Sequence, residues 1–329
     1  MSLRGRLLQL LADGRFYSGA SLGQSLGVSR SAVWKHIRFL QARQVEIHAV
    51  RGRGYRLARP LELLSRQAIV QAMDHISAAR LARLDVLTEV DSSNRFLLAR
   101  ARHGAVSGDA CLAEYQSAGR GRQGRSWVSP FAANIYLSLL WRFPCGAEGL
   151  GGLGLAVGVS VLRAIRALGV PDARLKWPND LVYKDRKLAG LLLEMSSDAS
   201  GGCHVVIGVG LNVRMPAPAS GAIDQPWIDL EQVLGCSLAQ SLSRNRVAAG
   251  LLQQLLHDIT HFQSDGLKSF IDDWRHFDNL SDRPVSLSTP AGEIHGIARG
   301  IDDHGALRIE SDGRIQRYLA GDVSVRLSA

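Results

Sequence analysis

Between residues 110 and 130 the chain reads Ala110-Cys-Leu-Ala-Glu-Tyr-Gln-Ser-Ala-Gly-Arg-Gly-Arg-Gln-Gly-Arg-Ser-Trp-Val-Ser-Pro130. Residues 110–115 are typical of a buried strand, and the spacing of Gly119, Gly121 and Gly124 matches the dinucleotide-binding pattern. That pattern needs a helix N-terminus directly after the glycines to hold a pyrophosphate, whereas here Pro130 follows and no helical period begins. We therefore expect an irregular loop at this position and not a Rossmann turn.

Arginines alternate with the glycines of this loop. Glycine lets the backbone approach a ligand closely, and each guanidinium of Arg120, Arg122 and Arg125 can pair bidentately with a carboxylate or phosphate. We therefore predict a loop that encloses an anion, mobile when empty and closed when a charged ligand binds. Trp127 follows the loop, and it could offer an aromatic face to a base or be an ordinary core side chain.

The segments around the loop predict more strands than helices. We expect strands at 82–90, 110–115, 134–141, 187–194 and 205–212, a turn entering a strand at 176–183, and helices at 95–102 and 153–168. Because the strands often follow one another directly, the pattern favours an α+β body with a mixed sheet. Within it, Lys176-Trp-Pro-Asn-Asp180 places an amide and a carboxylate on a turn fixed by Pro178, which suits a metal-bound phosphate. The simpler alternative is that Asp180 caps the turn.

The net positive charge is confined to the first sixty residues. Residues 1–60 contain ten arginines and Lys35 against Asp13 and Glu46, which gives +9, the formal net charge of the whole chain of 329 residues. The remaining residues are therefore neutral overall. Such confinement indicates a nucleic-acid-binding unit attached to a neutral body, although a merely solvated basic face would look the same.

The pattern of residues 1–57 supports the nucleic-acid interpretation. Helical spacing predicts helices at 3–11, 18–26 and 30–43, with Ser29 as the N-cap of the third, and a hairpin with a basic, glycine-rich tip at 45–57. This is the arrangement of a winged helix-turn-helix, whose polar third helix enters a major groove. The predicted DNA-binding residues are Arg30, Ser31, Trp34, Lys35, Arg38, Arg51 and Arg53.

Other features of the sequence argue against export and metal binding. The first residues lack a signal-peptide pattern, and no uncharged apolar stretch reaches the roughly 18 residues of a membrane span, so we expect a cytoplasmic protein. The four cysteines are isolated, which fits reduced thiols better than disulfides or a zinc site. His257-Asp-Ile-Thr-His261 is similar to a zinc-protease pattern, but we expect a solvated helix face there.

Five segments in order along the chain resemble the bifunctional biotin protein ligases that double as biotin operon repressors. They are Asp91-Ser-Ser-Asn94, Glu114-Tyr-Gln-Ser-Ala-Gly-Arg-Gly-Arg-Gln-Gly-Arg-Ser-Trp127, Lys176-Trp-Pro-Asn-Asp-Leu181, Arg186-Lys-Leu-Ala-Gly190 and Gly208-Val-Gly-Leu-Asn212. The resemblance covers essentially the whole chain. One departure is Ser93, where the family usually has threonine; the hydroxyl is kept and one methyl group is lost.

The resemblance implies three domains. These are a winged helix-turn-helix at 1–62, a mixed-sheet α/β ligase domain at 63–280, and an SH3-like β-barrel at 281–329. It also implies a two-step reaction, in which biotin and ATP with Mg²⁺ form biotinyl-5'-AMP and a lysine of a biotin carboxyl carrier protein then displaces AMP. No side chain needs to form a covalent intermediate, so catalysis would be positioning and charge neutralisation.

The family's ligand contacts can be carried over residue by residue. The residues implied for biotin are Ser92, Ser93, Asn94, Gln116, Arg120, Gly121, Arg122 and Lys187. Trp127, Asn179 and Asn212 look like adenylate contacts, and Lys176 and Asp180 would place phosphate and Mg²⁺. Arg122 and Lys187 are the implied catalytic residues, and no metal ligand is certain.

The resemblance further implies a ligand-promoted homodimer that binds operator DNA of biotin synthesis genes with biotinyl-5'-AMP as corepressor. Two alternatives stay open. A lipoate or octanoate ligase shares the catalytic architecture but would not normally carry a winged helix. A regulator whose body only senses a small molecule is the other, although the retained loop and Lys187 argue against it.

Overall fold

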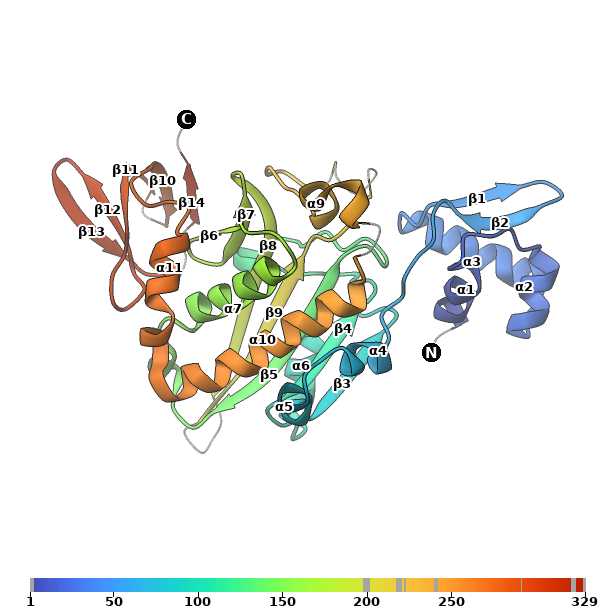
Figure 1. The fold of residues 1–329 in the computed structure, drawn as a ribbon, viewed down its shortest axis with the longest axis horizontal. Coiled ribbons are helices and arrows are strands. Elements are labelled where there is room, and N and C mark those ends of the chain that lie inside the picture. Colours follow the sequence, from blue (N-terminus) through green and yellow to red (C-terminus); the bar gives the residue numbers. More distant parts are fainter. Residues whose placement is uncertain are drawn as a thin grey trace.

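The computed structural model describes residues 3–197, 202–216, 221, 223–239, 242–290, 292–320 and 324–327. Figure 1 shows a small helical unit at the N-terminal end, a large sheet with helices in the middle, and a second, smaller sheet at the C-terminal end. The family likeness predicted this order of units.

The N-terminal unit consists of helices and one hairpin. Its elements are α1 (Leu3–Leu11), α2 (Gly19–Leu26), α3 (Arg30–Ala42), β1 (Ile47–Val50) and β2 (Gly54–Leu57). Ser18 and Ser29 begin α2 and α3, because each side chain accepts a hydrogen bond from the backbone N–H three residues later. Gly54 has a φ of +98°, and a Cβ there would lie 2.0 Å from Tyr17 O, so only glycine lets the hairpin close on the helices. The predicted helix-turn-helix with a wing is therefore present.

The central sheet has seven strands in the order β3-β4-β5-β9-β8-β7-β6. The strands are β3 (Arg83–Leu87), β4 (Asp109–Ala113), β5 (Ile135–Phe143), β6 (Arg174–Lys176), β7 (Asp180–Tyr183), β8 (Arg186–Ser197) and β9 (Cys203–Leu211). The β3–β4 pair is parallel and the other pairs are antiparallel. The predicted mixed sheet of an α+β protein is confirmed.

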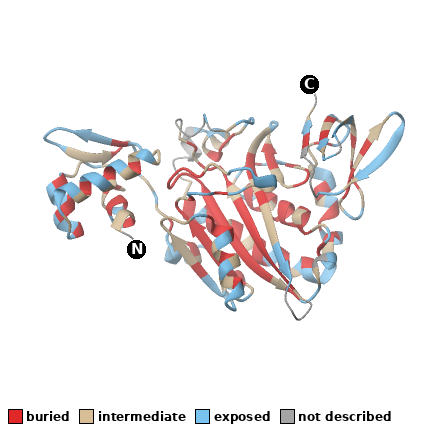
Figure 2. Cartoon of the chain, turned by 180° about the vertical axis from the view of Figure 1, so that it is seen from behind, coloured by how far each residue is buried: buried red, intermediate tan, exposed pale blue. Residues whose placement is uncertain are grey.

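Helices cover both faces of this sheet. One face carries α4 (Arg66–Gln71), α5 (His75–Arg80), α7 (Leu153–Ala167), α10 (Arg244–Asp265) and α11 (Ile271–Phe277), and the other carries α6 (Ser93–Arg102). The alternation along β5 shows the division, because Leu139 joins the main core while Leu140 packs with Leu97 of α6. Figure 2 shows that the central strands are buried along most of their length. The remaining helical segments are α9 (Leu230–Ala239), η1 (Arg122–Gly124), η2 (Ala147–Leu150) and η3 (Gly266–Ser269).

The helical segment Glu148–Ala167, which contains α7, is long and apolar enough to cross a membrane by length and composition alone. In this structure 67% of its most apolar window is buried inside the protein. Its side chains pack against the central sheet and α10. This segment is a core helix here.

The C-terminal sheet has five antiparallel strands in the order β13-β12-β11-β10-β14. They are β10 (Pro284–Thr289), β11 (Gly292–Ile301), β12 (Leu307–Ser311), β13 (Arg314–Tyr318) and β14 (Ser324–Leu327). Within the part of the chain that the structure describes, β13 and β14 are the two edges and do not pair with each other. The strands match the predicted all-β domain, but closure into a barrel is not found among the described residues and stays a prediction.

One helix boundary differs from the sequence-based expectation. The helix expected from residue 95 begins at Ser93, and its N-cap Ser92 makes no side-chain capping bond. The side chains of Ser93 and Asn94 in its first turn are hydrogen-bonded to groups of the site described below. The segment 176–183 is, as expected, a turn entering a strand: residues 177–179 form the turn of the β6–β7 hairpin, with the cis peptide bond Trp177-Pro178, and β7 follows.

Candidate functional site

A cavity of about 770 Å³ lies between the N-terminus of α6, the arginine loop (residues 119–125), strands β8 and β9, and the end of the C-terminal sheet. Its lining includes most of the residues predicted to bind ligand: Ser92, Ser93, Asn94, Gln116, Arg120, Gly121, Arg122, Trp127, Lys176, Asn179, Asp180 and Lys187. Asn212 is not among the lining residues. Its amide donates to Lys187 O and Ile228 O, so it braces the backbone behind the cavity.

One end of the cavity is lined by buried hydroxyl and amide groups. Gln116 Oε1 accepts from the backbone N and the Oγ of Ser93, at 2.9 and 3.0 Å. Behind them the buried Ser138 Oγ lies 2.8 Å from Ser93 Oγ and 2.6 Å from Asn94 Oδ1. These groups offer both donors and acceptors to a small polar ligand ring, and Ser138 is a member that the sequence did not single out.

The arginine loop folds back on itself. Gly121 N donates to Arg125 O at 2.7 Å, and Trp127 N donates to Gly119 O at 2.9 Å. Gln123 sits at the tip with a φ of 53°. No long helix follows, in agreement with the prediction of a loop, although residues 122–124 form a short 3₁₀ turn. The loop therefore projects Arg120 and Arg122 toward the cavity that they line.

The ring of Trp127 lies against two paired glycines of the sheet. Gly190 of β8 is opposite Gly210 of β9, and a Cβ at these positions would lie 2.9 and 2.4 Å from atoms of the Trp127 ring. Any side chain there would displace the ring. Since Trp127 also lines the cavity, its packing and a stacking role are compatible, and the sequence alternatives do not exclude each other.

Cations collect at the other end of the cavity. Lys187 Nζ lies 2.8 Å from Asp180 Oδ1 and 5.5 Å from the centre of the Trp127 ring. Arg122 Nη1 donates to Asn179 Oδ1 at 3.3 Å. Burial lowers the pKa of Lys176, and the nearby charges of Lys187 and Arg326 add to that effect while Asp180 opposes it. This end of the cavity suits a ligand with several negative charges.

The C-terminal sheet forms a wall of the cavity that the sequence analysis missed. Arg326 of β14 lines it, and Arg122 Nη2 donates to Ala320 O just before the described part of β14. Trp177 Nε1 donates to Gly305 O at 3.1 Å and ties the β6–β7 turn to the same domain. Residues so distant in sequence give no local pattern that would reveal this contact.

The residues predicted to bind DNA are all exposed on the N-terminal unit. Arg30, Ser31, Trp34, Lys35 and Arg38 lie on the outer face of α3, and Trp34 is 53% exposed. Arg51 and Arg53 lie at the tip of the hairpin. A large aromatic side chain left open to solvent beside basic residues is consistent with a binding face.

One carboxylate joins the N-terminal unit to the body. Arg4 Nη1 and Arg43 Nη2 lie 2.9 and 3.2 Å from the two oxygens of Glu89. The Arg43 guanidinium, directly after α3, also lies 5.1 Å from the centre of the Tyr115 ring. Tyr115 precedes Gln116 of the cavity, so the end of the third helix touches the segment that carries the site.

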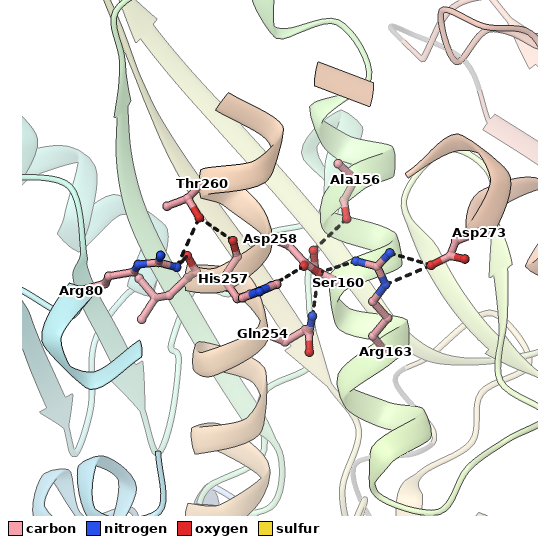
Figure 3. A network of polar contacts seen from close by, with 10 residues as sticks. Arg80, Ala156, Ser160, Arg163, Gln254, His257, Asp258, Thr260 and Asp273 are labelled. Atoms are coloured by element: carbon pink, nitrogen blue, oxygen red, sulfur yellow. Dashed lines mark hydrogen bonds and ion pairs between the residues drawn. The ribbon is translucent and has the colours of Figure 1, made fainter. Parts of the chain in front are cut away.

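The segment 257–261 lies on α10, away from the cavity. His257 and His261 are exposed, as expected, but Asp258 is 2% exposed and forms an ion pair with Arg163 Nη1 at 3.1 Å (Figure 3). Burial alone would raise the Asp258 pKa, yet hydrogen bonds and the charge of Arg163 hold it below its usual value. The expectation of a solvated face is wrong for Asp258. Among the described residues no cluster of three or more His, Cys, Asp or Glu could hold a metal.

Comparison with known proteins assigns the family. The Bifunctional ligase/repressor BirA of Escherichia coli (strain K12) is 42% identical over 321 residues, which covers 98% of this chain and 96% of that protein. This chain belongs to the bifunctional biotin ligase/repressor family. Residues 87–212 match the biotin/lipoate A/B protein ligase family, 4–56 a helix-turn-helix domain and 280–326 the biotin protein ligase C-terminal domain.

More distant relatives support the ligase part of this family assignment. The biotin acetyl-CoA-carboxylase ligase of Mycobacterium tuberculosis is 38% identical over 247 residues, 73% of this chain and 88% of that protein. Among solved structures, the biotin protein ligase from Aquifex aeolicus in complex with biotin and ATP has a TM-score of 0.62 and 27% identity, covering 75% of this chain and 100% of that one. The predicted resemblance to the bifunctional ligase/repressor family is therefore confirmed.

Proposed function

We propose that this member of the ligase/repressor family activates biotin with ATP and transfers it to a lysine of a biotin carboxyl carrier protein. A biotin carboxylate oxygen attacks the α-phosphorus of ATP and pyrophosphate leaves, which gives biotinyl-5'-AMP. The acceptor amine then attacks the acyl carbon, loses a proton and displaces AMP. The single observation that carries this proposal is one cavity with buried hydroxyls and amides at one end and cations at the other.

The polar end suits the ureido ring of biotin. Ser92, Ser93, Asn94 and Gln116 are buried and line the cavity there, so desolvated donors and acceptors are held in place for a ring with both. Arg120 and Gly121 also line the cavity, and we place the biotin carboxylate beside them. Arg122 and Lys187 would neutralise the charge that grows as the carboxylate attacks phosphorus.

The cationic end suits the nucleotide. Trp127 offers a ring face to adenine, Asn179 an amide, and Lys176 and the C-terminal Arg326 offer positive charge to the phosphates. Asn212 braces the backbone behind the cavity, and its expected contact with the adenylate stays a prediction. The cavity volume of about 770 Å³ is sufficient for a nucleotide joined to a small acid.

ATP would enter as its Mg²⁺ complex. The donor chemistry fits, because Mg²⁺ takes oxygen ligands and usually needs only one or two protein carboxylates beside substrate phosphates. Asp180 supplies such a carboxylate in the cavity wall. The ion would neutralise phosphate charge, and Lys187 beside Asp180 would share that task.

We further propose that biotinyl-5'-AMP acts as corepressor for operator DNA of biotin synthesis genes. The exposed face of α3 and the hairpin tip would read the DNA, and a ligand-promoted homodimer would present two such faces to a palindromic site. The contact of Arg43 with Glu89 and Tyr115 supports coupling between the cavity and the DNA-binding unit. We also propose domains at 1–62, 63–280 and 281–329, an SH3-like barrel for the last, and a cytoplasmic location.

Biotin-dependent exchange of labelled pyrophosphate into ATP tests the enzymatic proposal. Purified protein should catalyse exchange with biotin and Mg²⁺ and transfer biotin to an added carrier domain. Lipoate and octanoate in place of biotin serve as controls. Exchange that depends on lipoate and not on biotin would assign the protein to the sister activity.

A further inference from the structure

Glu194 of β8 contacts two cavity residues at once although it does not line the cavity itself. Arg120 Nη1 lies 2.6 Å from Glu194 Oε1, and Asn94 Nδ2 lies 2.9 Å from Glu194 Oε2. The Glu194 side chain is 18% exposed. One partly buried carboxylate therefore connects the polar end of the cavity to the arginine loop.

These contacts belong to a longer hydrogen-bonded chain. The chain runs, contact by contact, through Arg120, Glu194, Asn94, Ser138, Ser93, Gln116, Ser129 and the carbonyl oxygen of Trp127. Its first member is at the start of the arginine loop, and its last lies two residues after the end of the loop. The hydrogen-bonded chain therefore connects the residues at the two ends of the arginine loop through the central sheet.

Glu194 and the carbonyl oxygen of Leu192 together orient the Asn94 amide toward the ligand. An ionised carboxylate only accepts hydrogen bonds, so the Asn94 NH₂ group must point toward Glu194, where its second partner is Leu192 O at 3.1 Å. The Oδ1 of Asn94 then faces Gly208, a residue that lines the cavity. The cavity is thereby offered an acceptor, which is what an N–H of a ureido ring requires.

The serine hydroxyls beside Asn94 can adapt to such a ligand. Ser138 has one proton, which it can give to Asn94 Oδ1 at 2.6 Å or to Ser93 Oγ at 2.8 Å. When it gives the proton to Ser93, a lone pair of Asn94 Oδ1 becomes available to the ligand. Glu194 keeps the amide in the same orientation in both arrangements.

We propose that Glu194 is a positioning residue for biotin: it fixes the Asn94 amide and holds Arg120 over the cavity before the ligand arrives. This inference rests on the proposed biotin-activating function. Because the effect is to organise the ground-state site, loss of Glu194 should weaken biotin binding more than it slows chemistry.

Glu194→Gln is the decisive substitution, because it keeps the shape and removes the second acceptor oxygen. Its amide can accept from Arg120 or from Asn94 but not from both. In pyrophosphate exchange we expect the KM for biotin to rise about tenfold or more, with kcat and the KM for ATP changed by less than about threefold. Glu310→Gln is the matched control, since Glu310 pairs with Arg299 at 2.7 Å in the C-terminal sheet.

Glu194→Asp provides the conservative rescue. It keeps both acceptor oxygens and the charge but shortens the side chain, so we expect a KM for biotin between those of the unsubstituted protein and Glu194→Gln. A thermal melt of each variant shows whether it folds. If Glu194→Gln does not fold, the comparison of Glu194→Asp with the unsubstituted protein carries the test.

Four results would overturn the inference. An unchanged KM for biotin would leave Glu194 a plain ion pair, and a lower KM would mean that it competes with the ligand for Arg120. A similar-fold rise in the KM for biotin and the KM for ATP, together with a similar-fold fall in kcat, would indicate general disruption of the site. If the unsubstituted protein showed no biotin-dependent exchange, the proposed function would fail and this inference with it, whereas an active protein indifferent to Glu194→Gln removes this inference alone.

Discussion

Lys187 Nζ lies 2.8 Å from Asp180 Oδ1, at the end of the cavity where cations collect. A lysine that is paired with a carboxylate and set against the Trp127 ring is held in one place before ligand binds. In the proposed reaction the Lys187 ammonium group would leave Asp180 and pair with the phosphate and carboxylate oxygens as they approach. Several predictions about the chemistry depend on this pair.

Removal of a cavity cation should slow adenylate formation. We expect Lys187→Ala and Arg122→Ala each to lower kcat/KM in pyrophosphate exchange roughly 100-fold or more, the usual cost of losing one such donor. Lys184→Ala is the control, because Lys184 is an exposed residue of the neighbouring turn that packs on Tyr183. If either cavity variant exchanged pyrophosphate as fast as the unsubstituted protein, the substituted residue would have no part in adenylate formation.

Asp180→Asn should change the response to Mg²⁺. The substitution keeps the turn and loses one negative oxygen ligand, so half-maximal exchange should need several-fold more Mg²⁺ than in the unsubstituted protein. A titration of Mg²⁺ at saturating ATP and biotin measures the shift. The same Mg²⁺ requirement in both proteins would mean that Asp180 serves only to hold Lys187 and the turn.

Substitutions on α3 should separate DNA binding from catalysis. Lys35→Ala and Arg38→Ala remove exposed charges from the predicted groove-facing surface and should weaken binding to promoter DNA, with a smaller salt dependence, while pyrophosphate exchange is unchanged. Arg314→Ala removes an exposed charge from the C-terminal sheet and is the control. If the α3 substitutions left the affinity for DNA unchanged, the DNA-binding surface would lie elsewhere.

Asp278, in the segment between α11 and the C-terminal sheet, should make the stability of the folded protein depend on pH. Burial raises its pKa to about 6, against an ordinary value of 3.8, and a hydrogen bond from Leu280 N opposes the shift. Because the folded pKa is the higher one, the buried acid contributes no penalty below pH 4 and becomes destabilising as the pH rises through 6.

Asp278→Asn should therefore raise the free energy of unfolding at pH 7 to 8 by up to about 3 kcal/mol, from about 1.4 kcal/mol per pKa unit. The gain should fade as the pH is lowered from 6 to 4. Denaturant unfolding of both proteins across this range measures it. A gain that does not vary with pH would mean that the carboxyl is not desolvated as the structure implies.

The sequence predicted what local pattern determines. The apolar spacing and the cap Ser29 predicted the N-terminal helices, and the absence of a helical period after Gly124 predicted a loop where a motif search would predict a Rossmann turn. The contact of Asp180 with Lys187, by contrast, depends on the register of the β7–β8 hairpin, which is irregular between Leu181 and Val182 and is not shown by the apolar pattern.

The features that were missed depend on contacts between distant residues. Polarity at Ser93 and Asn94 resembles helix capping in the sequence, yet both side chains face Gln116 and Ser138, so the helix starts earlier than predicted. Arg326 reaches the cavity only because the C-terminal sheet packs against the ligase body. Asp258 looks like a surface residue until Arg163 of another helix is placed beside it.

A chain that makes biotinyl-5'-AMP and uses it as its own corepressor should bind its operator according to the supply of biotin and ATP. The most direct test measures the affinity of the purified protein for the promoter of the biotin synthesis genes, with biotin, with ATP and Mg²⁺, and with all three. We predict that all three together strengthen binding and promote a dimer in sedimentation, that neither biotin nor ATP suffices alone, and that Lys187→Ala responds only to preformed biotinyl-5'-AMP. DNA affinity that is the same under every condition would contradict the claim and leave a ligase with a DNA-binding unit but no corepressor switch.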